Sequence, residues 1–248
     1  MKAASPALLM CLLISSARAV CNVPQPRLVC AEYFKEQAVV IAHLVRTRYV
    51  DPKKEDVMDY HIYTMQTERV LRGQINPSFR IYEENSSARA GFEWKEGERY
   101  LLFLSYSKGD KGWELDGCGN SRPVEEAAAV LQEIDRIKGA GNADGGEISG
   151  EVWFDPGVTV IAQGSGGTFR TRSGRGGRFK IRVPAGVYSV RAVQRETPFE
   201  ADDFSYEDPR RVRLVNGGCV QIRFVLASQD HPTGPAEQLS RRFSAAPR

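Results

Sequence analysis

The hexapeptide Arg99-Tyr100-Leu101-Leu102-Phe103-Leu104 is the stretch that most directly indicates the fold of this chain. It is short and, after its first residue, entirely apolar or aromatic. A run of this kind is typical of a strand that is buried on both faces. We therefore expect a central buried strand here, within a domain built mainly of strands.

The segments on either side continue this pattern. Further strands are expected at residues 38–45, 60–71, 79–82 and 113–115. A short helix is expected around residues 29–37. After Pro123 the apolar residues follow the i, i+3, i+4 spacing of an amphipathic helix, which Gly139 would end. The expected buried face of this helix is Val124, Ala127, Ala128, Leu131 and Ile134.

Residues 139–146 are the clearest linker in the chain. Apart from two alanines, the segment has no apolar side chain, and half of its residues are glycine, so it cannot bury itself. It separates a first domain at 20–138 from a second at 147–227.

The second domain consists of strands and turns. In Arg178–Val183 apolar Phe179, Ile181 and Val183 alternate with basic residues, as in a half-buried strand. Short strands separated by Gly-rich turns favour a seven-stranded β-sandwich. The expected strands are residues 148–153, 158–162, 168–172, 178–183, 187–193, 211–215 and 220–226.

The first 19 residues read as a cleaved secretory signal. Lys2 precedes an apolar run at 7–14, and Ala17-Arg18-Ala19 presents small residues where signal peptidase reads them. The run is shorter than the ~20 residues that span a bilayer. We expect a secreted or periplasmic chain with no membrane span and a disordered polar tail at 228–248.

The cysteines agree with export. Removal of Cys11 with the signal leaves Cys21, Cys30, Cys118 and Cys219, an even number in an oxidising compartment. Four cysteines allow three pairings, and their spacing does not choose among them.

The first domain resembles the netrin-like module that is also found in tissue inhibitors of metalloproteinases. The resemblance covers most of residues 20–138 and rests on the order of several short motifs. These are Cys21, Val39–Ala42, Arg69–Gly73, Gly97–Phe103 and Gly117–Pro123. It implies an OB-type β-barrel with a terminal helix.

The family's disulfides imply a pairing here. Members have two early cysteines in two bridges, and one partner lies in a Ser/Cys/Gly stretch before the central strand. Here only Cys21 is early, and Ser86–Gly91 has no cysteine, so both halves of one bridge are missing together. The resemblance implies a Cys21–Cys118 bridge, which leaves Cys30 either paired with Cys219 or free.

The second domain is similar to carboxypeptidase regulatory-like modules, which have a transthyretin-like sandwich fold. The residues that carry this similarity are Ile148–Val152, Pro156–Val160, Gly177–Ile181 and Val183–Val190. The family's role is non-catalytic: folding support, adhesion or presentation of a neighbouring domain.

A row of basic side chains marks the second domain. If residues 173–177 form a hairpin turn, five cations share one face: Arg170, Arg172, Arg178, Lys180 and Arg182. Such a row favours an anionic partner such as an acidic glycan or a lipid headgroup. The alternative is a solvated face that protects an edge from aggregation. The domain has twelve Lys and Arg against nine Asp and Glu, a small excess that favours this alternative.

Catalytic and metal-binding patterns are weak. Gly174–Gly177 lacks the GK[ST] and the helix of a phosphate loop, and Ser165 lacks a nucleophile elbow's strand-to-helix turn. His43, His61 and His231 are far apart in the sequence, and no CxxC pair exists, which argues against structural zinc. We expect no enzyme activity, no metal and no cofactor.

The sequence therefore predicts an exported, non-catalytic binding protein. Its expected partner is an extracellular or envelope protein or an anionic glycan, and not nucleic acid. The alternative is a metalloproteinase inhibitor. Tissue inhibitors chelate the protease zinc through an N-terminal cysteine, but here cleavage leaves Val20 before Cys21, and the extra residue displaces the amine. Val20, Cys21 and Asn22 are the candidate residues for that activity.

Overall fold

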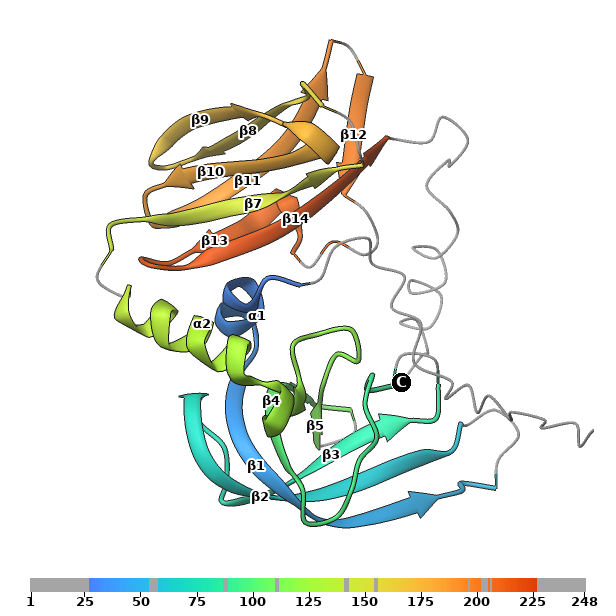
Figure 1. Cartoon of the computed structure of the whole chain (residues 1–248). Coiled ribbons are helices and arrows are strands. Elements are labelled where there is room, and N and C mark those ends of the chain that lie inside the picture. The colour runs from blue at the N-terminus through green and yellow to red at the C-terminus, as the bar shows by residue number, and fades with distance from the viewer. Residues whose placement is uncertain are drawn as a thin grey trace, which may run out of the picture. The chain divides into compact units, whose positions relative to one another are not determined.

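The computed structural model describes most of the chain between residues 27 and 226. The described residues are 27–53, 58–86, 89–109, 112–140, 143–153, 156–195, 197–201, 205 and 207–226. The predicted signal at 1–19, residues 20–22 and the predicted tail at 228–248 lie outside them. The prediction of a mainly β chain is confirmed (Figure 1).

Residue contacts divide the described chain into two compact units. Unit 1 holds residues 37–127, and unit 2 holds residues 27–36 together with the chain from residue 128 onward. The chain therefore passes from unit 2 to unit 1 and back again. The division places residues 128–138 with unit 2, whereas the linker predicted from composition follows them at 139–146.

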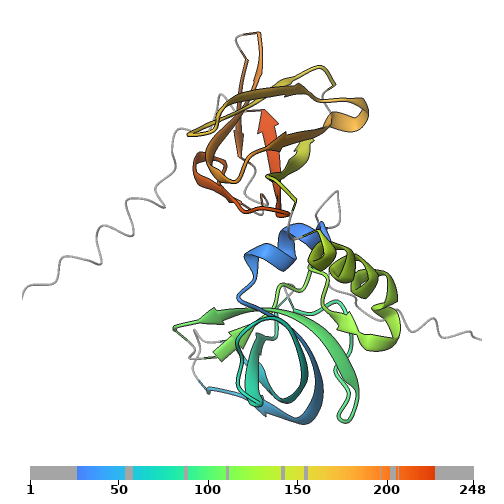
Figure 2. The ribbon, with the colours of Figure 1, turned by 90° about the vertical axis from the view of Figure 1, so that its left-hand side faces the viewer.

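Unit 1 is built on strands whose pairings close on themselves. The strands pair in the order β1, β2, β3, β5, β4, and β4 pairs again with β1. Among the described strands of unit 1, only the pairing of β3 with β5 is parallel. Figure 2 shows these strands curling into a ring. The strands are β1 (Ala38–Val50), β2 (Tyr60–Gly73), β3 (Ser78–Glu84), β4 (Arg99–Ser107), β5 (Gly112–Glu114) and β6 (Arg122–Pro123), which adds to β4.

The core of unit 1 centres on β1 and β4. Residues 100–104 are each at most 1 % exposed, which confirms the predicted central strand. In the antiparallel register Val40 lies opposite Leu102, and both side chains are fully buried. The hydroxyl of Tyr100 accepts a hydrogen bond from the Lys95 backbone N–H at 2.7 Å, so this buried polar group is satisfied.

Within the described residues, unit 2 combines two α-helices with eight strands. Helix α1 (Val29–Lys35) and helix α2 (Ala128–Gly139) lie side by side. Residues 124–126 form a 3-10 turn at the end of unit 1, so α2 begins later than predicted. The buried face of α2 is Val130, Ile134 and Ile137. Ile134 was expected there, whereas Ala128 is exposed and Leu131 is only partly buried.

The strands of unit 2 form one path of pairings, β10–β7–β14–β12–β11–β8–β9, with β13 paired to β11. The central pair β7–β14 is parallel. Strand β12 pairs with both β11 and β14, so it joins the two halves of the path. The strands are β7 (Gly146–Val152), β8 (Thr159–Gly164), β9 (Gly167–Arg172), β10 (Arg178–Val183), β11 (Gly186–Gln194), β12 (Thr197–Ala201), β13 (Val212–Leu214) and β14 (Cys219–Leu226).

The expected count of seven strands is wrong, because β12 was missed. This strand is five residues long and contains Pro198, which cannot donate to a ladder and lowers strand propensity. The seven predicted strands are all found, with bounds shifted by at most two residues.

Segment 173–177 is not the turn of a hairpin. It contains a 3-10 turn at Arg175–Gly177 and leads from β9, which pairs with β8, to β10, which pairs with β7. The alternation predicted for β10 is confirmed: Phe179, Ile181 and Val183 are buried, and the basic residues between them are exposed.

A disulfide fastens α1 to the second half of the chain. Cys30 is bonded to Cys219 of β14, with 5.8 Å between their Cα atoms. The backbone N–H of Leu28 also donates to the side chain of Gln221 on the same strand at 2.8 Å. Cys118 also takes part in a disulfide. Its predicted partner, Cys21, lies outside the described residues, so that pairing stays a prediction.

Candidate functional site

Unit 1 has a cleft over β2 and β3. Its volume is about 920 Å³, within the ~300–1,000 Å³ usual for ligand sites. It is bordered by the two strands, by the segment 89–98 and by Pro123 and Glu126.

The strand register brings the first wall together. His61 and Tyr63 lie two residues apart on β2, so their side chains share a face. His61 lies opposite Glu83 of β3, which places this carboxylate on the same face.

Glu83 holds the cleft wall in place. One of its oxygens accepts hydrogen bonds from the Tyr63 hydroxyl at 2.9 Å and from Trp94 Nε1 at 3.2 Å, and the other accepts from the Ala90 N–H at 2.7 Å. Burial and the Glu83 charge raise the pKa of Tyr63 well above its ordinary value of 10. The Tyr63 hydroxyl therefore stays protonated and remains a donor to Glu83.

Aromatic rings form a continuous run behind this wall. Trp94 stacks on Tyr63 with 4.4 Å between ring centroids, and Phe92 lies 4.8 Å from Trp94. On the other side of Tyr63 the ring of His61 is stacked at 5.9 Å, and Tyr49 follows His61 at 5.3 Å. Phe92 and Trp94 are only partly buried, so the run gives the cleft an apolar floor.

The lining of the cleft is acidic. Its five glutamates outnumber one arginine and one lysine. Lys95 is paired with Glu98 at 3.3 Å, and Arg89 donates to the Asn85 side chain at 3.1 Å. The glutamates are Glu83, Glu84, Glu93, Glu98 and Glu126. The cleft therefore offers many hydrogen-bond acceptors and a negative potential.

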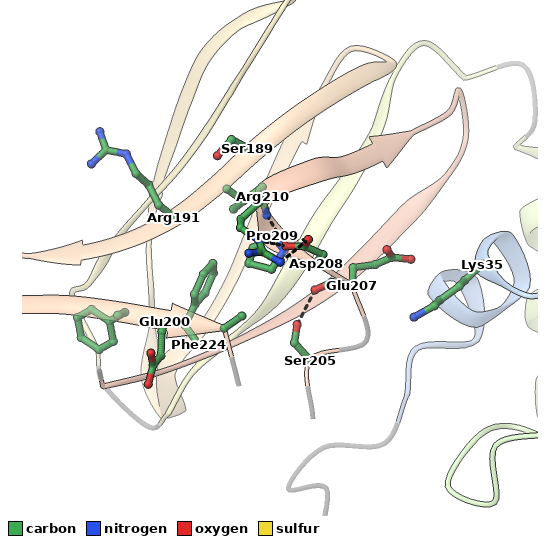
Figure 3. A pocket seen from close by; sticks show the side chains of 13 residues that line it. Lys35, Ser189, Arg191, Glu200, Ser205, Glu207, Asp208, Pro209, Arg210 and Phe224 are labelled. Atoms are coloured by element: carbon green, nitrogen blue, oxygen red, sulfur yellow. Dashed lines mark hydrogen bonds and ion pairs between the residues drawn. The ribbon is translucent and has the colours of Figure 1, made fainter. Parts of the chain in front are cut away.

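Unit 2 has a second hollow, of about 680 Å³, beside β11 and β12 (Figure 3). Asp208 is bound by Arg210 through two nitrogens, which lowers the pKa of Asp208. Burial raises the pKa of the neighbouring Glu207, although the positive charge of Lys35 partly opposes the rise. The pocket thus mixes both signs of charge around the rings of Phe199 and Phe224.

The structure separates the five cations of the predicted basic row. Arg170 and Arg172 lie on β9, whereas Arg178, Lys180 and Arg182 lie on β10, and the two strands do not pair. All five are exposed.

Acidic residues of β7 accompany the β10 group. Lys180 Nζ is 2.9 Å from Glu147, and Arg182 lies directly opposite Glu147 in the register. The β9 group instead shares its exposed face with Arg191 of β11 and Arg213 of β13, which were not predicted from the sequence as part of the row. The alternation of apolar Tyr188, Val190 and Ala192 with polar Ser189 and Arg191 was a signal that Arg191 points outward.

Neither the cleft nor the second pocket was predicted. The cleft is lined from β2, β3 and the irregular segment 89–98, and the second pocket from β11, β12 and residues 207–210. No sequence motif links the residues of either hollow. Of the histidines considered in the sequence, His43 has its Nδ1 3.4 Å from Glu68, and Glu68 is paired with Arg99 at 2.7 Å, so this imidazole lies beside a surface ion pair. In the described part of the chain no three His, Cys, Asp or Glu side chains are grouped to hold a metal ion. Residues 20–22, the candidates for protease inhibition, lie outside the described ranges.

Comparison with known proteins adds no assignment: no protein-family model matches the chain, and no curated protein is found to be similar to it. The two family resemblances therefore stay predictions. Among the described residues, no helix is long and apolar enough to cross a membrane.

Proposed function

We propose that the protein is an exported, non-catalytic binding protein and that unit 1 is an OB-type barrel that binds an uncharged oligosaccharide in its cleft. The observation that carries this proposal is the position and lining of the cleft, which lies over β2 and β3 and is rich in carboxylate acceptors. The strand 2–3 face is where OB-type barrels bind oligonucleotides and oligosaccharides.

The pairing order of unit 1 supports the barrel. Strands β1, β2, β3, β5 and β4 close into a ring, and the parallel β3–β5 contact is the step that closes it. A five-stranded, partly open Greek-key barrel is the architecture of this fold. For unit 2 we propose a transthyretin-like sandwich of the carboxypeptidase regulatory-like kind, which is supported by its two groups of strands joined at β12.

The negative charge of the cleft lining favours one class of ligand over the others that OB-type barrels bind. Nucleic acids and acidic glycans would be repelled by the excess of glutamates. Sugar hydroxyl groups donate hydrogen bonds, and ionised carboxylates are the strongest acceptors among side chains. An uncharged oligosaccharide therefore suits this cleft, with the half-buried Trp94 and Phe92 offering apolar contact.

The hydrogen bonding of Glu83 supports a role in binding over one in catalysis. Both of its oxygens are engaged by the fold itself, through Tyr63, Trp94 and Ala90. A general acid or base needs a carboxyl oxygen within reach of the substrate proton. Glu83 is thus a positioning residue for the wall of the cleft.

The proposal is tested by calorimetric titration of the full chain with cello-, malto- and chito-oligosaccharides of four to six sugars. We expect micromolar to millimolar binding of at least one of them and an affinity loss of about tenfold in Glu126→Ala, which removes one acceptor from the lining. Glu125→Ala is the matched control, because Glu125 is an exposed neighbour outside the cleft. Absence of binding, or equal losses in the two variants, would refute the proposed site.

A further inference from the structure

Among the described residues of unit 2, four strands present an exposed face that carries arginines and no acidic residue of their own. It is formed by the outward-pointing residues of β8, β9, β11 and β13, and these four strands contain neither Asp nor Glu. We call it the arginine face, and its cations are Arg170, Arg172, Arg191 and Arg213.

The register sets the arginines in a regular pattern. Arg170 of β9 lies opposite Ile161 of β8, and Ile161 lies opposite Arg191 of β11, so the three residues form one row across the strands. With about 4.8 Å between neighbouring strands, the outer two Cα atoms are about 10 Å apart. Arg172 lies two residues farther along β9, a step of about 7 Å.

An apolar residue lies between Arg170 and Arg191 on this face. Ile161 points outward with Arg170 and Arg191, yet it is only 6 % exposed. This burial is expected if the aliphatic stems of the flanking arginines cover it. At the other end of β11, Arg213 lies opposite Val187.

Protection of a sheet edge does not explain this arrangement. Basic residues on the terminal strand β9 would serve that purpose. Arg191, however, lies on β11, which is paired with β8 along most of its length and also with β12 and β13. Within the described residues none of the four arginines is in an ion pair. The nearby Glu200, Glu207 and Asp208 belong to the pocket that borders Arg191, and Asp208 is bound by Arg210.

We propose that the arginine face binds an acidic polysaccharide through its carboxylate or sulfate groups. Guanidinium groups bind such anions through two parallel hydrogen bonds, and a row of cations on rigid strands suits a polymer with repeated charges. This site is separate from the cleft of unit 1 in residues, charge and ligand.

The composition of the face favours a polysaccharide over the other polyanions. Its described residues include no exposed aromatic side chain on which bases would stack, as single-stranded nucleic acids require. Among them Val187 is the one exposed large apolar residue, at 42 %, too little for insertion into a lipid surface.

The test measures binding of the full chain to immobilised heparin, which is sulfated, and to polygalacturonate, which is carboxylated. We expect binding that weakens with added salt and falls at least tenfold in the double variant Arg170→Gln/Arg191→Gln. The matched control is Arg178→Gln/Arg182→Gln on β10, which removes the same charge from exposed positions and should change the affinity less than twofold. Equal melting temperatures would show that both variants fold.

Three results would overturn the proposal. The first is failure to bind either polysaccharide. The second is an equal loss in both double variants, which would reveal attraction by net charge alone. The third is sedimentation with anionic phosphatidylglycerol vesicles while both polysaccharides are ignored. Oligosaccharide binding by unit 1 should be unchanged in Arg170→Gln/Arg191→Gln, so the experiments test the proposals for the two sites independently.

Discussion

The Trp94 indole Nε1 donates a hydrogen bond to Glu83 at 3.2 Å and so ties the irregular segment 89–98 to strand β3. The same oxygen of Glu83 receives the Tyr63 hydroxyl at 2.9 Å. One carboxylate therefore fixes both an aromatic side chain of β2 and the segment that forms the rim of the cleft.

Replacing Glu83 with alanine should loosen this rim and destabilise unit 1. The change removes three hydrogen bonds to a charged acceptor and leaves partly buried donors unsatisfied, so we expect a loss of about 2–4 kcal/mol. Urea unfolding followed by tryptophan fluorescence measures it. Glu84→Ala, at an exposed neighbouring position, should cost no more than about 0.5 kcal/mol. Similar losses in the two variants would contradict the role of Glu83.

Removal of the Cys30–Cys219 bond should destabilise unit 2. The two residues are 189 positions apart, so the bond strongly restricts the unfolded chain. We expect Cys30→Ala/Cys219→Ala to lower the free energy of unfolding by about 2–5 kcal/mol. Treatment of the native protein with dithiothreitol should lower the free energy of unfolding of unit 2 by a similar amount. The same treatment of the double variant should leave the stability of unit 2 unchanged. If the double variant and the native protein unfold at the same midpoint denaturant concentration, the bond contributes nothing to stability.

Gly150 should not tolerate a side chain. A Cβ at this position would overlap the backbone carbonyl of Ile222 on the neighbouring strand β14. Gly150→Ala should therefore force β7 and β14 apart and cost about 3 kcal/mol or more. The control is Gly157→Ala, where φ is +82° but no atom lies within 4 Å of the new Cβ, so only the backbone penalty of about 1–2 kcal/mol applies. Thermal unfolding compares the two, and the reverse order of cost would be inconsistent with this packing.

The stability contributed by Glu207 should fall as the pH rises. Burial raises its folded-state pKa above the ordinary 4.5, so at higher pH the unfolded chain releases the proton before the folded chain does. Glu207→Gln keeps the side chain neutral. We expect it to match the native protein near about pH 3.5 and to become progressively more stable than the native protein as the pH approaches about 7.

Asp208 should show the opposite dependence. Its hydrogen bonds to Arg210 lower its folded-state pKa below 3.8, so its contribution is present at neutral pH and lost as the pH falls. Asp208→Asn should therefore be less stable than the native protein near pH 7 and should approach it in acid. Unfolding curves across this pH range give the difference in free energy of unfolding between each variant and the native protein. If this difference changes with pH in the same direction for Glu207→Gln and Asp208→Asn, the proposed difference between the two environments is wrong.

Local patterns in the sequence were enough to place most strands. The apolar run at 99–104 and the alternation at 178–183 both predict their elements because burial on two faces or on one leaves a direct signature in the order of residues. Strand β12 has no such signature: it is five residues long and contains Pro198. Gly150 lies within Ile148–Val152, and the reason for a glycine there required the position of β14.

Long-range pairing explains what the sequence did not predict. The basic row was derived from a supposed hairpin, and nothing in residues 173–177 distinguishes a hairpin turn from a passage between differently paired strands. The cleft unites Glu83, Trp94 and Glu126, which are separated by more than ten residues each and share no spacing rule.

The sequence by itself determined that the chain is mainly β, which residues are apolar on each strand, and that its cysteines were candidates for bridges. Only the tertiary structure decided that Cys30 meets Cys219, that Glu83 meets Trp94, and that Arg170 shares a face with Arg191 rather than with Lys180. The physical reason is that strand formation follows the local alternation of side chains, whereas the choice of partner strand depends on contacts between residues far apart in the chain.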